Sequence, residues 1–373
     1  MDFALSEEQA LLQDEVRRFV ARDCPPSRVR ALFDAEAGFD PGLWKQLAAL
    51  GLAGVALPEW AGGAGRGALE LALVAEELGR GTVPAPFLEH ALAGLAIALG
   101  GDEAQQRRWL PALASGERLG TVAFAEAGPR DPAHGWEPAT WRVRLGAGRL
   151  HGAKRLVPSG AHADLLVVGT AGGGLAVVEA ARGGLRATPC ADLDRTRRSA
   201  DLALDGAAGE ALPRGAQAAP RVRDAGLALL AADAFGAAFA LVRASAAYAA
   251  TRQQFGRPLA EFQAVKHQLA EMALEVDPLR GLVWYAAHAF DALPERAPRA
   301  AALAKAHVTE RASAVARRAV EMHGGLGFTW ECDVQIFYKR IVFDRLFLGT
   351  PELHRERAAA LAGWGAGPEP GAG

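Results

Sequence analysis

The sequence has few of the residues that would indicate a secreted or metal-binding protein. Its three cysteines, Cys24, Cys190 and Cys332, stand far apart, are odd in number and show no metal-ligand spacing. They favour reduced thiols in a cytoplasmic protein over a disulfide framework, and we expect no metal site. The first residues also lack a basic stretch followed by an apolar run, so we expect no secretory signal.

An excess of one charge is also absent. The chain has 41 basic and 43 acidic residues, for a formal net charge of -2. This balance gives no general electrostatic attraction to nucleic acid or to an anionic membrane, so we expect neither as a partner. Any anionic ligand must therefore be bound by local groups.

Only one stretch is apolar enough to raise the question of a membrane span. Residues 225–250 are long enough to cross a bilayer, but they contain Asp233 and Arg243 and consist largely of alanine. A helix buried in a large bundle explains this composition better, so we expect no membrane span.

The hydrophobic periodicity changes twice along the chain. Helical spacing extends to about residue 115, short runs broken by glycine and proline follow, and helical spacing returns from about residue 222. Strands are predicted near residues 141–145, 165–168 and 175–178. This order predicts an α+β protein with the following parts: an N-terminal helical domain (residues 1–117), a middle β-domain (118–212), a C-terminal four-helix bundle (213–364) and a disordered tail (365–373).

Two stretches carry groups suited to a phosphate-bearing ligand. Between two helical patterns, Phe255-Gly256-Arg257-Pro258 follows Arg252, whose planar guanidinium at a helix end suits a phosphate or carboxylate. A capped helix corner with solvated charges is the simpler alternative. The second stretch, Glu321 to Trp330, contains three glycines, which let backbone N–H groups approach a ligand closely, whereas a plain helix cap needs only one.

The run that begins at Arg252, Arg-x-x-Phe-Gly-x-Pro-Leu-x-x-Phe-Gln-x-Val-x-His-x-Leu-Ala-x-Met, resembles the flavin-contacting helix junction of the acyl-CoA dehydrogenase family. The helical, β, helical order matches that family over nearly the full length. The resemblance implies FAD as cofactor, an acyl-CoA or acyl carrier substrate, and electron-transfer flavoprotein as electron acceptor. It also implies a homo- or hetero-tetramer in which subunits share each FAD.

The resemblance assigns the FAD contacts residue by residue. They are Arg252, Phe255, Gln263, Glu321, His323, Gly324 and Gly325 across a subunit boundary, Phe124, Glu126, Leu156, Val157 and Pro158 in the β-domain, and Thr350 and Glu352 near the C-terminus. Several positions depart from the family pattern. Glu321 replaces a glutamine, Leu156 a tryptophan and Pro158 a threonine, and the loop that keeps Gly128 and Asp131 is one residue short.

The family's catalytic base is missing. Residues 346–355 align with Tyr-Glu-Gly-Thr-x-Glu-Ile-Gln-Arg, in which the glutamate removes the α-proton of the acyl thioester, and here that glutamate is Leu348. Leucine has no titratable group, so it cannot act as a general base. In some members the base lies on the preceding helix, at a position that falls here at Gly226. Asp233, two turns further on, is a remaining candidate, although an aspartate buried against Arg243 or a helix cap is the ordinary explanation.

The rest of the substrate site is retained in part. The resemblance assigns substrate contacts to Leu348, Gly349 and Asp224, and the backbone N–H of residue 348 could still polarise a thioester carbonyl. We therefore expect an FAD-dependent acyl-CoA dehydrogenase-like subunit for α,β-dehydrogenation that takes its base from a partner. A flavin monooxygenase of the same fold, which needs no carboxylate at position 348, and a non-catalytic scaffold subunit are the alternatives.

Overall fold

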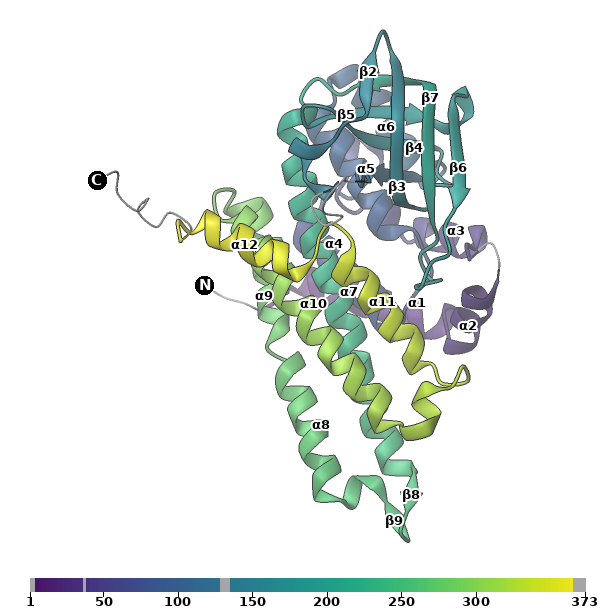
Figure 1. Ribbon diagram of the computed structural model, residues 1–373, viewed down its shortest axis with the longest axis vertical. Coiled ribbons are helices and arrows are strands. Elements are labelled where there is room, and N and C mark those ends of the chain that lie inside the picture. The colour runs from purple at the N-terminus through teal and green to yellow at the C-terminus, as the bar shows by residue number, and fades with distance from the viewer. Residues whose placement is uncertain (1–3, 36–37, 128–134, 365–373) are drawn as a thin grey trace, which may run out of the picture.

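The computed structural model describes residues 4–35, 38–127 and 135–364, so the predicted disordered tail lies outside the described residues. Helices from both ends of the chain pack against a β-sheet formed by the middle of the chain (Figure 1). This arrangement confirms the predicted α+β class. The sheet lies at one end of the long axis, and the hairpin β8–β9 lies at the other.

The N-terminal helices are α1 (Glu7–Asp23), α2 (Pro26–Asp34), α3 (Pro41–Ala49), α4 (Ala68–Arg80), α5 (Phe87–Gly100) and α6 (Glu103–Ala114). The first begins with the predicted cap: the Gln9 backbone N–H donates to Ser6 Oγ at 3.2 Å, and the Ser6 N–H donates to Gln9 Oε1 at 3.0 Å. This reciprocal pair satisfies two backbone donors of the helix start.

The middle strands are β1 (Gly120–Ala123), β2 (Arg144–Gly146), β3 (Arg149–Pro158), β4 (Leu165–Thr170), β5 (Gly174–Glu179), β6 (Leu185–Pro189) and β7 (Ser199–Ala211). They form one sheet in the order β1-β4-β5-β7-β3-β2, with β6 also paired to β7. Among the strands that the structure describes, only β1 and β4 pair in parallel. The strands predicted near 165–168 and 175–178 are confirmed as β4 and β5.

The strand predicted at residues 141–145 was only partly right. Strand β2 starts at Arg144, and Trp141 instead ends a short 3-10 turn. Its indole ring stacks on Phe124 with ring centroids 5.0 Å apart and packs over the backbone of Gly169, where a Cβ would lie 2.4 Å from the ring. Burial of this large side chain explains why the backbone at Trp141 forms a turn and not a strand.

The C-terminal elements are α7 (Gly215–Thr251), β8 (Gln253–Gln254), β9 (Arg257–Pro258), α8 (Gln263–Val276), α9 (Leu279–Ala292), α10 (Ala297–Met322), α11 (Val334–Leu346) and α12 (Pro351–Leu361). Helix α7 contains the predicted apolar stretch. By length and composition it could span a membrane, yet 83% of its most apolar window is buried inside the protein. It packs against α4, α5, α10 and α11, as expected for the central helix of a bundle.

Two glycines allow α4 and α7 to cross at very short range. A Cβ on Gly79 would lie 2.2 Å from the Asp233 carbonyl oxygen, and one on Gly236 would lie 1.9 Å from the Glu76 carbonyl oxygen. No other residue fits at either position without separating the helices. The N-terminal domain is therefore packed directly, backbone against backbone, on the central helix of the bundle.

Candidate functional site

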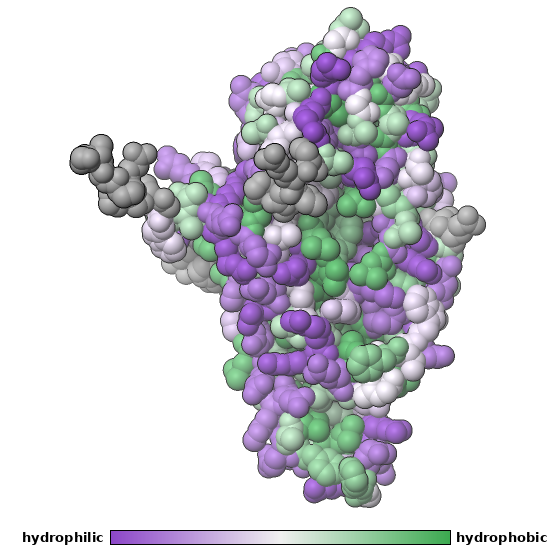
Figure 2. All heavy atoms as spheres, in the orientation of Figure 1, coloured by the Kyte–Doolittle hydropathy of each residue, from purple (hydrophilic) through white to green (hydrophobic). Residues whose placement is uncertain are grey.

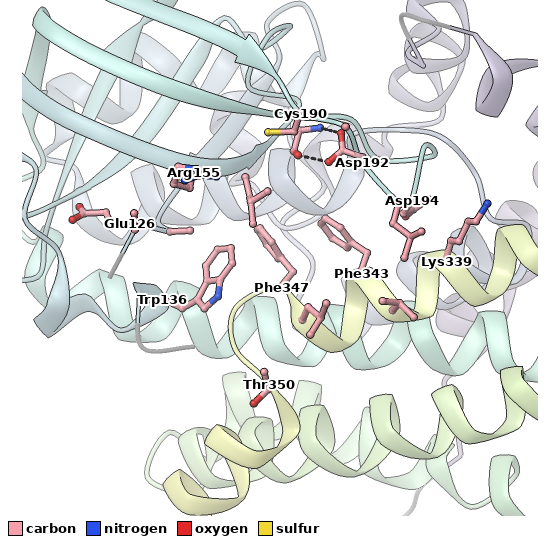
Figure 3. Close-up of a pocket in the computed structure, with 18 residues that line it drawn as sticks. Glu126, Trp136, Arg155, Cys190, Asp192, Asp194, Lys339, Phe343, Phe347 and Thr350 are labelled. Carbon is pink, nitrogen blue, oxygen red and sulfur yellow. Dashed lines mark hydrogen bonds between the residues drawn. The ribbon is translucent and has the colours of Figure 1, made fainter. Parts of the chain in front are cut away.

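A cavity of about 610 Å³ lies between the β-sheet and the C-terminal half of α11 (Figure 3). Strand β3 and the segment between β6 and β7 form one wall, and α11 with the turn to α12 forms the other. The lining residues are Ala125, Glu126, Ala127, Trp136, Arg155, Leu156, Cys190, Ala191, Asp192, Leu193, Asp194, Ser199, Lys339, Val342, Phe343, Leu346, Phe347 and Thr350. The cavity is large enough for a cofactor or drug-sized ligand.

On the sheet side, a β-bulge directs Leu156 into the cavity. The pairing of β3 with β7 shifts between Lys154 and Val157, and Leu156 takes the left-handed conformation (φ 51°) with 46% of its surface exposed. Asp201 holds this bulge, because its carboxylate accepts from the Leu156 N–H at 3.0 Å and pairs with Arg155 at 2.6 Å. Of the three predicted contacts on this strand, Leu156 lines the cavity, whereas Val157 and Pro158 are buried in the sheet.

On the helix side, three aromatic rings form a continuous apolar wall. Phe343 and Phe347 stack with centroids 5.0 Å apart, and Trp136 meets Phe347 edge-on at 4.8 Å. Figure 3 shows these rings facing Arg155 and Cys190 across the cavity. Such a wall suits a flat heteroaromatic ring better than a hydrated ligand.

Glu126 lies at the edge of the cavity, but its carboxylate is already engaged. It pairs with buried Lys154 at 2.6 Å and accepts from the backbone N–H groups of Arg142 and Val143 at 2.8 and 3.2 Å. Burial lowers the pKa of Lys154 to about 8, although Glu126 opposes that shift. Phe124 is buried against Trp141 and does not line the cavity.

Gly128 and Asp131 of the same predicted loop lie outside the described residues. At the far end of the cavity, Asp192 is also engaged. Its carboxylate accepts from the Ser199 backbone N–H at 2.8 Å and from the Ser199 hydroxyl. The carboxylate next to Cys190 therefore holds the start of β7.

Leu348, which the sequence motif predicts at the position of the family's base, is fully buried. It takes the left-handed conformation (φ 59°), which is uncommon for a leucine. Its Cδ1 lies so close to α7 that a Cβ on Gly226 would be 2.5 Å away, and that same Cβ would be 3.1 Å from Leu92. The two residues predicted at the family's base positions, Leu348 and Gly226, are thus packed against each other, and both are apolar.

The turn around Leu348 leaves two backbone donors without acceptors. Among the described residues, the N–H groups of Leu348 and Thr350 form no hydrogen bond. Thr350 lines the cavity, and its hydroxyl caps α12 by accepting from the Leu353 N–H. A buried donor without an acceptor costs about 1–3 kcal/mol, so an acceptor on a ligand would stabilise this turn.

Gly349 and Glu352 complete this segment. Gly349 has φ 105°, and a Cβ there would lie 2.7 Å from Leu353 and 3.0 Å from His354, so the turn requires glycine. Glu352 is exposed in the first turn of α12 and pairs with Arg345 at 3.0 Å. Its carboxylate lies outside the cavity.

The structure gives Asp224 and Asp233 structural partners. Asp224 is buried and pairs with Arg357 at 2.8 Å, away from the cavity lining. Asp233 is bound on both carboxylate oxygens by Arg340 at 2.7 Å and is also bound by Arg197 at 2.5 Å. The expected pairing of Asp233 with Arg243 or a helix cap is therefore wrong, because arginines from two other parts of the chain bind its carboxylate. Neither carboxylate is available as a base.

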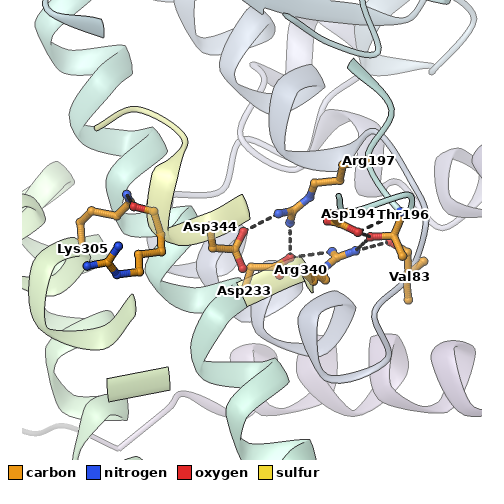
Figure 4. A network of polar contacts seen from close by, with 9 residues as sticks. Val83, Asp194, Thr196, Arg197, Asp233, Lys305, Arg340 and Asp344 are labelled. Carbon is orange, nitrogen blue, oxygen red and sulfur yellow. Dashed lines mark hydrogen bonds and ion pairs between the residues drawn. The ribbon is translucent and has the colours of Figure 1, made fainter. Parts of the chain in front are cut away.

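Arg197, Asp233, Arg340 and Asp344 form a buried charged centre where three parts of the chain meet (Figure 4). Arg340 also donates to the carbonyl of Val83 at 3.0 Å, which ties in the N-terminal domain. Burial alone would raise the pKa of Asp233, but the charges of Arg197 and Arg340 outweigh it and lower that pKa. Burial and the nearby Asp233 raise the pKa of Asp344 well above its usual range.

The predicted cross-subunit contacts lie far from this cavity. Arg252, Phe255 and Gln263 are exposed at the β8–β9 end of the molecule, with Phe255 93% exposed. Figure 2 shows hydrophobic residues gathered at that end. The ring of Phe328, in the segment between α10 and α11, is also exposed. One chain cannot bring these side chains to its own cavity.

The glycine-rich stretch divides into exposed and buried residues. Glu321, Gly324 and Gly325 are exposed, whereas His323 is buried. The His323 ring stacks on Tyr248 at 4.4 Å, and its Nδ1 lies 2.7 Å from the Ala319 carbonyl oxygen. His323 therefore stabilises the end of α10 and does not present a side chain to a ligand.

Several site residues were not identified from the sequence. They include Trp136, Arg155, Cys190, Asp192, Lys339, Phe343 and Phe347. Phe343 and Phe347 have the i, i+4 spacing of one helix face, which was a usable signal for an aromatic wall. The segment between β6 and β7 carries no comparable pattern, because only the tertiary fold brings it to the cavity.

Comparison with known proteins matches both helical parts of the chain to acyl-CoA dehydrogenases. Residues 6–117 match the acyl-CoA dehydrogenase N-terminal domain, and residues 215–362 match the C-terminal domain. The acyl-CoA dehydrogenase IpdE2 of Mycolicibacterium smegmatis is 32% identical over 95% of this chain and 99% of its own length.

Solved structures agree over the whole chain. A Tcur3481-Tcur3483 steroid ACAD variant is 35% identical, with a TM-score of 0.87 over 96% of this chain and 98% of that one. The ChsE4-ChsE5 complex of Mycobacterium tuberculosis is 28% identical, with a TM-score of 0.86 over 98% of this chain and 100% of that one. The expected family is confirmed: the chain belongs to the acyl-CoA dehydrogenases, a family of oxidoreductases.

Proposed function

We propose that this chain is the base-lacking subunit of an FAD-dependent acyl-CoA dehydrogenase built from two unlike subunits. The observation that carries the proposal is the turn at residue 348. It keeps a buried backbone donor that has no acceptor among the described residues, and the residues that we assign to the family's two base positions, Leu348 and Gly226, carry no carboxylate. The site is equipped to orient a thioester, and the base for proton abstraction comes from the partner subunit.

The residues present fit FAD as the cofactor. The aromatic wall of Phe343, Phe347 and Trp136 suits a flat ring, and Leu156 closes the opposite side of a cavity of about 610 Å³. Thr350 supplies a backbone N–H at the rim. When bound, FAD would accept the hydride from the β-carbon of the substrate.

The substrate that we propose is an acyl-CoA thioester with a bulky acyl group. Two observations support this class. The Leu348 N–H has no acceptor among the described residues and is free to donate to a carbonyl oxygen, and relatives over nearly the full length include a structure described as a steroid ACAD. Electron-transfer flavoprotein is the proposed acceptor of the electrons.

The quaternary proposal follows from the distance between the cavity and the β8–β9 end. Arg252, Phe255 and Gln263 are exposed at the end of the molecule opposite the sheet, so they can complete a flavin site only in another subunit. A closed, symmetric assembly repeats the same contact between its subunits. A tetramer of two kinds of subunit would therefore bring these exposed residues to the flavin sites of neighbouring subunits. The exposed Phe255 and Phe328 would then be covered.

The proposal is tested by co-expressing this chain with a family subunit that has glutamate at the position of Leu348. We expect the FAD-loaded complex to dehydrogenate acyl-CoA when an artificial electron acceptor is added. It should lose that activity when the partner's glutamate is replaced by glutamine. Oxygen-dependent hydroxylation by this chain with reduced flavin would support a monooxygenase instead. If the partner is fully active without this chain, and this chain binds no FAD, the result would support a non-catalytic scaffold role for this chain.

A further inference from the structure

Three carbonyl groups around residue 348 are held by two buried side chains. Lys305 of α10 donates from Nζ to the Gly349 carbonyl at 2.7 Å and to the Arg345 carbonyl at 3.1 Å. His354 of α12 places Nε2 2.8 Å from the Leu348 carbonyl oxygen. Figure 4 shows Lys305 beside the end of α11 that leads into this turn.

Both side chains are costly to bury, so simple packing does not explain them. Lys305 and His354 are each fully buried, and no carboxylate of the described residues forms an ion pair with Lys305. Burial lowers the pKa of Lys305 to about 7 and that of His354 to about 3. Histidine is then neutral, and with its proton on Nε2 it donates to the Leu348 carbonyl.

Ordinary helix capping explains only one of these three contacts. The Arg345 carbonyl belongs to the last turn of α11, where backbone acceptors lack helical partners. The Leu348 and Gly349 carbonyls lie beyond that helix. Their two hydrogen bonds fix the peptide groups that follow Leu348, and the Arg345 contact fixes the backbone before it.

The peptide between these fixed points carries the unpaired donor. The N–H of Leu348 has no acceptor among the described residues, and Leu348 is kept in a left-handed conformation that leucine rarely adopts. Strain and an unpaired donor together indicate a backbone arranged for a ligand.

We propose that Lys305 and His354 are positioning residues that hold the turn so that the Leu348 N–H donates to the carbonyl oxygen of a bound acyl thioester. The inference rests on the proposed function, because it assumes a thioester in this site. Neither side chain touches the ligand. Both act by binding carbonyl groups of the turn from inside the bundle.

The test compares two ligands that differ only at the carbonyl: octanoyl-CoA and its thioether analogue S-octyl-CoA. Both are titrated against the FAD-loaded assembly in which the partner's glutamate is replaced by glutamine, so that octanoyl-CoA binds without being dehydrogenated. The ratio of the two dissociation constants reports the hydrogen bond to the carbonyl. One neutral hydrogen bond corresponds to a roughly two- to tenfold preference for the thioester. A merely structural loss would weaken both ligands equally and leave the ratio unchanged.

The variants are Lys305→Met, His354→Leu and His354→Gln, with exposed Lys45→Met as the control for loss of a cation. We expect the ratio to fall towards one in Lys305→Met and His354→Leu. It should persist in His354→Gln, whose amide can still donate to the Leu348 carbonyl, and in the control. If Lys305→Met does not fold, the two His354 variants decide the matter.

Two outcomes overturn the inference in distinguishable ways. A thioester preference that persists unchanged in His354→Leu and in folded Lys305→Met excludes the positioning role alone. Equal affinity of the unmutated assembly for both ligands excludes a thioester at this turn, and the proposed function falls with it.

Discussion

Two neighbouring regions along α11 differ sharply in their use of charge. Arg340 and Asp344 belong to the buried charged centre, which joins the N-terminal domain, the sheet and the bundle. Four residues after Asp344 lies Leu348, which has no titratable group and which we propose as the counterpart of the family's catalytic residue. Buried residues with strongly shifted pKa values therefore need not be catalytic, even when they lie near a candidate active site. In this chain they hold domains together, while the reactive position is apolar.

Breaking the charged centre should have the largest effect. Arg340→Met removes the bidentate partner of Asp233 and leaves a buried carboxylate under-compensated, so we expect a loss of about 3–5 kcal/mol in the free energy of unfolding. Denaturant unfolding measures it. Removing the charge of Asp233 as well should recover part of the loss. Arg355→Met, which breaks an exposed pair with Glu310, is the control and should cost less than about 1 kcal/mol.

A carboxylate introduced at the apolar turn should supply the base that this region lacks. Leu348→Glu should raise flavin reduction by acyl-CoA at least about 10²-fold over the unmutated chain, because a positioned base supplies that much. The site is apolar, so the pKa of the new carboxyl should be raised, and the rate should increase with pH as it ionises. Leu348→Gln is the matched control. Equal rates in the two variants would show that the gain does not come from a base.

The exposed β8–β9 end provides a third comparison. Arg252→Ala should weaken FAD retention roughly ten- to a hundredfold, since loss of a charge-assisted contact costs about 1.5–3 kcal/mol. Arg257 lies only five residues away, but its guanidinium stacks on Phe262 at 4.1 Å. Arg257→Ala should retain FAD like the parent. Similar affinities in both variants would refute the assignment of Arg252.

The smallest effect concerns Lys305 and pH. Its pKa is lowered to about 7 in the folded protein, below the unfolded value, so the unfolded chain binds more protons between these values. Stability should therefore rise with pH above about 7, by roughly 1 kcal/mol per pH unit at most from this group. The slope should be smaller in Lys305→Met, where only other groups such as Lys154, with its pKa of about 8, contribute to it. An identical pH dependence in both proteins would mean that Lys305 is not buried as described.

The fold was predictable because its signals are local. Glycine and proline mark the ends of α1, α7 and α10, and the change in periodicity marks the sheet. The partners of Asp233 were not predictable in this way. The sequence suggested Arg243 on the same helix, whereas the partners lie 36 and 107 positions away. Pairings at that separation depend on tertiary packing, which no single-sequence pattern records.

The candidate site was predictable only in part, because some of its residues lie in sequence motifs and others reach the cavity through tertiary packing. Thr350, Leu156 and Glu126, which the family motifs assign to FAD, line the cavity, and their contact with FAD stays a prediction. Phe124 and His323 instead face the interior, where ring stacking holds them. The wall formed by Cys190 and Asp192 was missed, since that segment reaches the cavity only through the pairing of β6 with β7.

The central claim is that this chain orients a thioester but cannot abstract its α-proton. The most direct measurement is anaerobic mixing of the isolated FAD-loaded chain with octanoyl-CoA and a bulky acyl-CoA while the visible flavin absorbance is followed. We predict a shift of the flavin spectrum on binding without bleaching, because the ligand is held while no base is present. Rapid bleaching by the isolated chain would contradict the claim and would require a base within this chain.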